Sequence, residues 1–474
     1  MLARAALTVL LLAGHLIVWH GVSAQTWTGL RNQNGVSMDI SSPTGYTSAG
    51  LAAQATVTST TDSVLLIINI NVASNAASYQ MAFTIFRTGV DLSTSGHVMA
   101  EIGPTTSSTE SQAMTFSFRD VPGIAGTFTY SVYATGSAIL SLNGQIRQIG
   151  ALSIPNSMAS NSATLYDEIT FTLAAMQPIT GLSAAITPPS ASHLVLVSVS
   201  FSIYTGLGNT VVDVSVLRNG QRLDTIAMQR VSLSEGSRLC TIIFLDSPGT
   251  TAGVAYSVSA GMPQGSSFKV CKSSRHLAHM NLLAVPAFTA SRISSEVAQT
   301  ISLDSWQSVG LFVTVTPLST SDNVLVTVNL NVCPTLATAT GVFSIFRNNL
   351  NLGDSTSGLQ TVTVGADGMY APVSMSFLDS PGVANTAVTY YVYAARLGTG
   401  SIVISANGQL RQLAAMVTNA ATAAPTPVPT VPPTVSPTRA PFAVAQGSIF
   451  TNVVLPPLFT LTFGLRLPTF TSTN

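Results

Sequence analysis

FLDSPG at residues 377–382 ends an alternating apolar run, and related stretches stand at residues 118–123 (FRDVPG) and 244–249 (FLDSPG). Apolar residues at every second position before each stretch indicate a strand with one buried face. The proline then fixes φ and cannot donate to a sheet, and the glycine permits positive φ. Each stretch therefore predicts a strand that ends in a turn.

The recurrence of this stretch defines the domain organisation. A second strand follows each copy, at residues 130–133, 256–259 and 390–393, and the copies are spaced by about 130 residues, which fits a small domain and not a solenoid unit. Several short strands and turns per copy are typical of a sandwich or jelly roll. We predict an all-β chain with three tandem β-sandwich (jelly-roll-like) domains, at residues 36–150, 164–285 and 296–417.

Short segments between these modules are small and polar. Residues 153–163 and 286–295 are therefore predicted to be linkers. Asn143-Gly144 and Asn407-Gly408 have the composition of hairpin turns, as does Asn219-Gly220.

A recurring pair of charged residues suggests an ion pair in every module. An arginine ends an apolar strand about thirty residues before the aspartate of each repeated stretch, so the two could meet at one end of a sheet. The predicted structural pairs are Arg87 with Asp120, Arg218 with Asp246, and Arg347 with Asp379. Solvated turn residues are the alternative.

The two ends of the chain differ from the modules. Residues 1–24 carry Arg4, an apolar run and a small-x-small site before Gln25, which predicts a signal peptide and a secreted, extracellular or cell-surface protein. Residues 420–441 are rich in Pro and Thr and predict an extended linker. Residues 446–474 form an apolar tail broken by prolines. We expect this tail either to dock on a module or a partner, or to be disordered. A contact with a membrane is expected only if the tail is a lipid-anchor signal.

The composition argues against several kinds of activity. Charged residues make up 8% of the chain, with 18 basic and 18 acidic side chains, so no surface for nucleic acid is predicted. No nucleophile elbow, phosphate loop or dinucleotide motif occurs. His276 and His279 have no cluster of ligands around them in the sequence and are expected to be exposed turn residues. We predict no catalytic, cofactor or metal site, and hence no enzyme.

The three cysteines do not form an obvious framework. Cys240 shares the inward positions of its strand, whereas Cys271 alternates with Lys269 and is expected to point outward. A disulfide between Cys240 and Cys271 remains an alternative, because the expected extracellular compartment is oxidising. Cys333 is expected to be a buried, inert thiol.

Around residues 377–392 the motif resembles the β-rich modules at the ends of tail-fibre and other virion surface proteins of marine phages and large algal viruses. The resemblance implies jelly rolls that bind receptors or form trimers. If single modules form trimers, three copies in one chain could pack around a pseudo-threefold axis within that chain. The alternatives are an extended string of modules and self-association between chains. The Pro/Thr segment is similar to those of secreted algal and protist surface proteins. The tandem arrangement behind a signal peptide departs from the viral pattern.

These observations favour a secreted, non-enzymatic protein that acts by adhesion or ligand binding. The expected partner is a glycan or a surface protein, bound by exposed Tyr and Asn side chains, with Asn143, Asn219 and Asn407 as candidate contacts. A carbohydrate-active enzyme with a cleft between modules is an alternative, and a virion or virus-derived surface protein is another.

Overall fold

The computed structural model describes residues 29–418 apart from 74–79, 94–96, 104–110, 207, 235, 272–275, 338 and 365–367. The predicted signal peptide, Pro/Thr linker and apolar tail lie outside these residues. The three modules fall within one compact unit, Met1–Ala423. Within the described part of the chain every element is a strand except one 3₁₀ turn, η2 (Ala287–Thr289), so the all-β sandwich class is confirmed.

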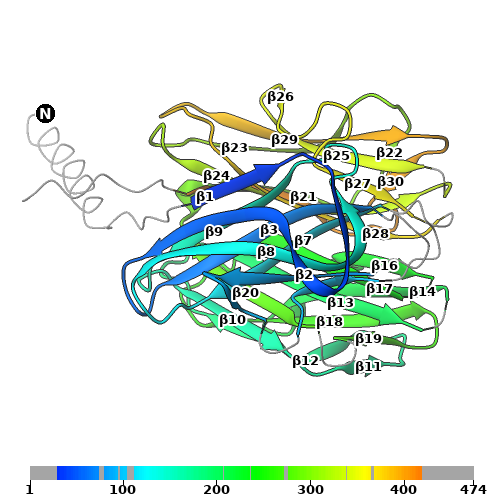
Figure 1. The fold of residues 1–474 in the computed structure, drawn as a ribbon, viewed down its shortest axis with the longest axis horizontal. Coiled ribbons are helices and arrows are strands. Elements are labelled where there is room, and N and C mark those ends of the chain that lie inside the picture. Colours follow the sequence, from blue (N-terminus) through cyan, green and yellow to red (C-terminus); the bar gives the residue numbers. More distant parts are fainter. Residues whose placement is uncertain are drawn as a thin grey trace, which may run out of the picture. The chain divides into compact units, whose positions relative to one another are not determined.

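The strands of module 1 are followed from blue to cyan in Figure 1. They are β1 (Gly29–Asn34), β2 (Met38–Val57), β3 (Ser63–Ala73), β4 (Met81–Arg87), β5 (Val90–Asp91), β6 (Ala100–Ile102), β7 (Ser111–Asp120), β8 (Gly126–Leu140) and β9 (Arg147–Ile154).

Modules 2 and 3 follow in green and in yellow to orange (Figure 1). Module 2 contains β10 (Ser160–Leu165), β11 (Ile169–Phe171), β12 (Gln177–Ile186), β13 (Leu194–Thr205), β14 (Thr210–Arg218), β15 (Gln221–Arg222), β16 (Gln229–Leu233), β17 (Gly236–Asp246), β18 (Val254–Gln264), β19 (Phe268–Val270) and β20 (Ala278–Val285). Module 3 contains β21 (Ala290–Ser295), β22 (Gln299–Ile301), β23 (Gln307–Val315), β24 (Asn323–Pro334), β25 (Thr340–Arg347), β26 (Leu350–Asn351), β27 (Gln360–Thr363), β28 (Ala371–Asp379), β29 (Val388–Leu397), β30 (Ile402–Ile404) and β31 (Arg411–Thr418).

Each module is a sandwich of an inner and an outer antiparallel sheet. The inner sheets are built on β9-β3-β7, β20-β13-β17 and β31-β24-β28, and the outer sheets on β2-β8-β4, β12-β18-β14 and β23-β29-β25. Every residue of β3 is buried, which explains its nearly continuous apolar sequence. One face of β3 lies in the core of module 1, and the other faces the neighbouring modules.

Two local predictions about the strands were wrong. The segments expected to be linkers carry β10 and β21, which pair with β20 and β31 as β1 pairs with β9. The chains flanking Asn143-Gly144 do not form a hairpin, because β8 pairs with β2, β3 and β4 whereas β9 pairs with β1 and β3. The same holds at Asn407-Gly408, where β30 and β31 both pair with β24. Small polar residues suit an edge strand as well as a loop, and composition alone cannot separate them.

The inner sheets of the three modules share a hydrophobic cluster. Corresponding strands contribute to it: Leu65 of β3, Leu196 of β13 and Leu325 of β24 occupy matching places, and Leu152, Leu283 and Met416 come from β9, β20 and β31. Each Å² of apolar surface that this cluster removes from water stabilises the contact by about 25 cal/mol. The face of each inner sheet that a single sandwich would leave to solvent is therefore covered by the other two modules.

A ring of hydrogen bonds accompanies this cluster. The Thr115 hydroxyl donates to the Ser374 carbonyl at 2.5 Å, the Ser374 hydroxyl donates to the Thr241 carbonyl at 2.6 Å, and the Thr241 hydroxyl donates to the Thr115 carbonyl. Each of these residues lies five positions before the aspartate of its repeated stretch. Equivalent residues thus make the same bond from module 1 to 3, from 3 to 2 and from 2 to 1.

Candidate functional site

The structure brings all three predicted Arg–Asp pairs together at the ends of strands. Arg347 Nη1 lies 3.0 Å from both carboxylate oxygens of Asp379. The corresponding contacts are 2.9 Å for Arg87 with Asp120, and 2.9 and 3.0 Å for Arg218 with Asp246. Since these aspartates are buried, they are not the solvated turn residues of the alternative interpretation.

A tyrosine completes each pair, which the sequence analysis did not foresee. The hydroxyls of Tyr130, Tyr256 and Tyr390 donate to the aspartates at 2.7–2.8 Å. Burial and the neighbouring carboxylate raise the pKa of the Tyr130 and Tyr256 hydroxyls. The tyrosine at the start of the second repeated strand was the available signal. In each Arg–Asp–Tyr group the buried carboxylate accepts from both the guanidinium and the hydroxyl, so the arrangement fits a structural role in fixing the turn.

The three asparagines proposed as ligand contacts lie in different settings. The Asn143 carbonyl accepts a hydrogen bond from Ser357 of module 3 at 2.5 Å, so this residue lies at a module contact. Asn219 occupies a tight turn with a φ of 51°, and its side chain accepts from the Ala255 amide at 2.8 Å. Asn407 is exposed and contacts Tyr370. The structure does not bring the three together in one site.

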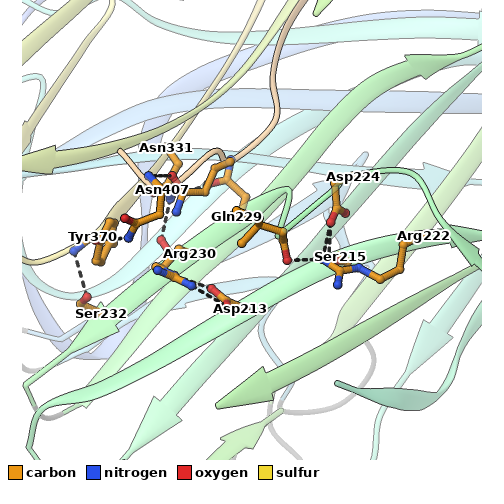
Figure 2. Close-up of polar contacts among 12 residues, drawn as sticks. Asp213, Ser215, Arg222, Asp224, Gln229, Arg230, Ser232, Asn331, Tyr370 and Asn407 are labelled. Carbon is orange, nitrogen blue, oxygen red and sulfur yellow. Dashed lines mark hydrogen bonds and ion pairs between the residues drawn. The ribbon is translucent and has the colours of Figure 1, made fainter. Parts of the chain in front are cut away.

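Asn407 belongs to the contact between modules 2 and 3 that Figure 2 shows. Arg230 donates to both carboxylate oxygens of Asp213 at 2.6 and 2.7 Å, and its guanidinium lies 5.2 Å from the centre of the Tyr370 ring. The hydrogen bonds to Asp213 raise the pKa of Arg230. The Ser232 amide donates to the Tyr370 carbonyl at 2.8 Å, and the Tyr370 amide donates to the Ser232 hydroxyl at 2.9 Å, which continues the contact. This polar cluster connects the two modules by hydrogen bonds and an ion pair.

The outer sheet of module 3 carries a row of aromatic side chains. Phe346 and Tyr393 lie 4.5 Å apart between ring centres, Trp306 packs edge-on against Phe346 at 5.6 Å, and Tyr391 lies 5.9 Å from Phe312. Phe312 is 55% exposed and the other four are partly exposed. The row crosses β23, β29 and β25, three adjacent strands, so it spans about 10 Å across the sheet.

Module 1 repeats part of this row. Phe86 and Tyr133 lie 4.6 Å apart and Tyr46 packs edge-on on Phe86, in the places that Phe346, Tyr393 and Trp306 occupy in module 3. Ala52 and Ser131, which pair across β2 and β8, stand where module 3 has Phe312 and Tyr391.

Module 2 has Met176, Leu217 and Ser259 in the corresponding places and so lacks the aromatic row. We call the five side chains of module 3 the aromatic face. Aromatic residues recurring at every second position of the 390–393 strand were its signal in the sequence, and partners from other strands could not be read from it.

The histidine and cysteine predictions need correction. His276 and His279 are buried and not exposed, because β20 packs against module 1. Cys271 is buried and not outward, since φ turns positive there (57°) and breaks the alternation. Cys240, Cys271 and Cys333 are free, and Cys333 is only half-buried.

No group of three or more His, Cys, Asp or Glu side chains among the described residues could hold a metal ion. The part of the chain with defined placement also contains no helix of the length and apolarity that a membrane crossing requires.

No protein-family model matches the chain, and no curated protein does. Among solved structures, the VP2 subviral particle of infectious bursal disease virus is similar with a TM-score of 0.21 and 9% identity, over 83% of this chain and 81% of that one. The tandem CBM22 domains of Paenibacillus barcinonensis Xyn10C give a TM-score of 0.15 and 11% identity, over 54% and 94%. The ANX2 ectodomain of Arabidopsis thaliana gives 0.14 and 12%, over 53% and 90%. These are distant likenesses of fold.

Proposed function

We propose that this chain is a secreted, non-enzymatic surface protein that binds glycan chains on the aromatic face of module 3. The face itself carries the proposal. Contiguous exposed aromatic side chains on a folded protein mark interaction surfaces, because water solvates them poorly. The rings present negatively polarised faces to which the C–H groups of a sugar ring are attracted.

The surroundings of the aromatic face favour a sugar over a hydrophobic partner. Hydroxyl groups border it: Thr314 and Thr389 lie beside the row, and Ser308 pairs with Tyr393. The row spans about the length of two linked sugar rings. The smaller group on module 1 offers a second, weaker platform, which raises the overall affinity for a long or branched chain. The test below distinguishes a glycan ligand from a protein ligand.

The sequence itself supplies the variants for this test. Phe312→Ala and Tyr391→Ser give module 3 the residues that module 1 carries at those places, so the sheet tolerates them. Ser257→Ala in module 2, at the place that Tyr391 occupies in module 3, is the matched control. We expect the purified chain to bind a subset of a broad glycan array without cleaving it. Each aromatic truncation should weaken binding by about 1 kcal/mol, or about fivefold.

Three results would overturn this function. Cleavage of the arrayed glycans would show an enzyme. Absence of glycan binding, with capture of a protein instead, would assign the face to a protein ligand. Binding that survives both truncations would place the site elsewhere.

We also propose that the three modules stay closed on one another in solution. The hydrogen-bond ring and the shared hydrophobic cluster support this. X-ray scattering of the mature chain should then give modules of about 120 residues packed as one body, whereas the profile of an extended string of modules would refute it.

A further inference from the structure

The three contacts between modules use the same positions but different residues. In module 1, Gln148 accepts from the Leu378 amide at 2.7 Å and donates to its carbonyl at 3.2 Å. In module 3, Gln412 makes the same two bonds to Leu245, at 2.6 and 3.2 Å. A neutral amide thus clamps module 1 to module 3, and another clamps module 3 to module 2.

Module 2 has a histidine at this position. His279 lies opposite Ser200 in β13, as Gln148 and Gln412 lie opposite Asn69 and Asn329. Its ring packs edge-on against Phe118 of module 1, with centres 4.9 Å apart. Three positions earlier, His276 replaces Gln145 and Gln409 in the same way, and its Nε2 contacts Glu101 of module 1. The contact between modules 1 and 2 therefore carries histidines where the other two contacts carry glutamines.

His279 is poorly placed to take up a proton. Its side chain is 3% exposed, Nδ1 lies 3.2 Å from the Thr164 hydroxyl, and Nε2 has no hydrogen-bond partner among the described residues. Burial lowers its pKa to about 3. A protonated ring would place a positive charge without a counter-ion in a buried contact beside Phe118.

The groups that face His279 do not offset this charge. Thr164 of β10, Ser200 of β13 and Phe118 of β7 are neutral. The next residue of β7 is the cation Arg119, whose side chain donates to Ser63. The carboxylate at this contact, Glu101 of β6, contacts His276, and Arg238 of β17 lies buried beside β6. A further histidine, His97, packs on Tyr166 at 5.7 Å.

We propose that the contact between modules 1 and 2 is a pH-sensitive joint, which loosens when His279 is protonated while the two glutamine contacts stay closed. In the open joint the imidazole regains its ordinary pKa near 6.5, so the open form binds more protons than the closed one. The contribution of neutral His279 to closure of the joint is fully present above pH 6.5. It declines as the pH falls from 6.5 toward the lowered pKa that His279 has in the closed joint. Each pH unit below 6.5 favours the open form about tenfold, which amounts to about 30-fold at pH 5.

Amide hydrogen exchange of the full chain at pH 7.5 and pH 5.0, corrected for intrinsic rates, tests this joint. We expect the protection of β7 and β20 to fall by about 30-fold at pH 5 relative to β28, which Gln148 holds. His279→Gln installs the residue of the other contacts and should abolish this difference, whereas His276→Gln should retain it. Gln412→His should transfer the acid response to the contact at Leu245.

Each alternative outcome refutes the joint. Equal responses of β7 and β28 in the parent chain would show no local opening. A response that persists in His279→Gln, or disappears in His276→Gln, would assign the acid sensitivity to other groups.

Discussion

Replacement of Arg347 by Ala measures what the buried Arg–Asp–Tyr group contributes. The variant removes the guanidinium that contacts both oxygens of Asp379 at 3.0 Å and leaves this buried carboxylate with the Tyr390 hydroxyl. Loss of one partner of a buried pair costs about 3–5 kcal/mol. Since the Arg347 side chain is 21% exposed, we expect the lower end, about 3 kcal/mol.

This cost translates into a modest thermal shift. An unfolding entropy of about 2.1 cal/mol/K per residue over about 390 residues gives about 0.8 kcal/mol/K, so the midpoint should fall by about 4 °C in scanning calorimetry. Arg396→Ala is the matched control, because its partner Asp304 is 66% exposed and such a pair contributes less than about 1 kcal/mol.

Addition of Asp379→Asn to Arg347→Ala should recover part of the loss, since the unpaired charge disappears. The reasoning fails if the melting temperatures of Arg347→Ala and Arg396→Ala differ by less than about 1 °C. At an unfolding entropy of about 0.8 kcal/mol/K, such a difference corresponds to only about 0.8 kcal/mol.

Two further predictions concern a tight backbone approach within module 1 and the burial of the cysteines. Gly136→Ala should lower the free energy of unfolding by about 2–4 kcal/mol in urea titration, because φ is +123° and a Cβ would stand 2.0 Å from the Gln80 carbonyl oxygen. Gly123→Ala, with a φ of +76° and open space around it, should cost only about 1 kcal/mol, and equal losses would contradict the steric explanation. A thiol reagent at pH 8 should modify Cys333 first, since burial raises the pKa of Cys271 to about 12 and also that of Cys240. Rapid modification of all three in the native state would disprove this order.

The sequence predicts where the strands of this fold lie better than it predicts which strands and modules contact one another. Alternation and the Pro-Gly turns identify the repeated strands, and the spacing of Arg347 and Asp379 anticipates their contact. Asn69 and Asn71 show what the sequence cannot predict. Their alternation with apolar residues indicates that both side chains lie on one face of β3, but not what they contact. Their partners Gln360 and Thr361 lie about 290 residues away, and no local pattern identifies them.

The histidines were misread for a related reason. Taken alone, HLAH at residues 276–279 resembles a polar turn. Aligned with QIRQ at 145–148 and QLRQ at 409–412, it occupies a module contact. The aromatic face is equally non-local, because four of its rings come from three strands that become neighbours only in the folded sheet, and Trp306 directly precedes one of them.

The covalent linkage of the three modules has a consequence for how this protein can change. In a trimer of identical subunits, one substitution appears three times and alters every contact together. Here Thr115, Thr241 and Ser374 fill equivalent places but are encoded separately, so each contact and each outer sheet can vary alone. Assembly also needs no encounter between molecules and does not depend on protein concentration. One module can thus specialise while its two neighbours preserve the fold.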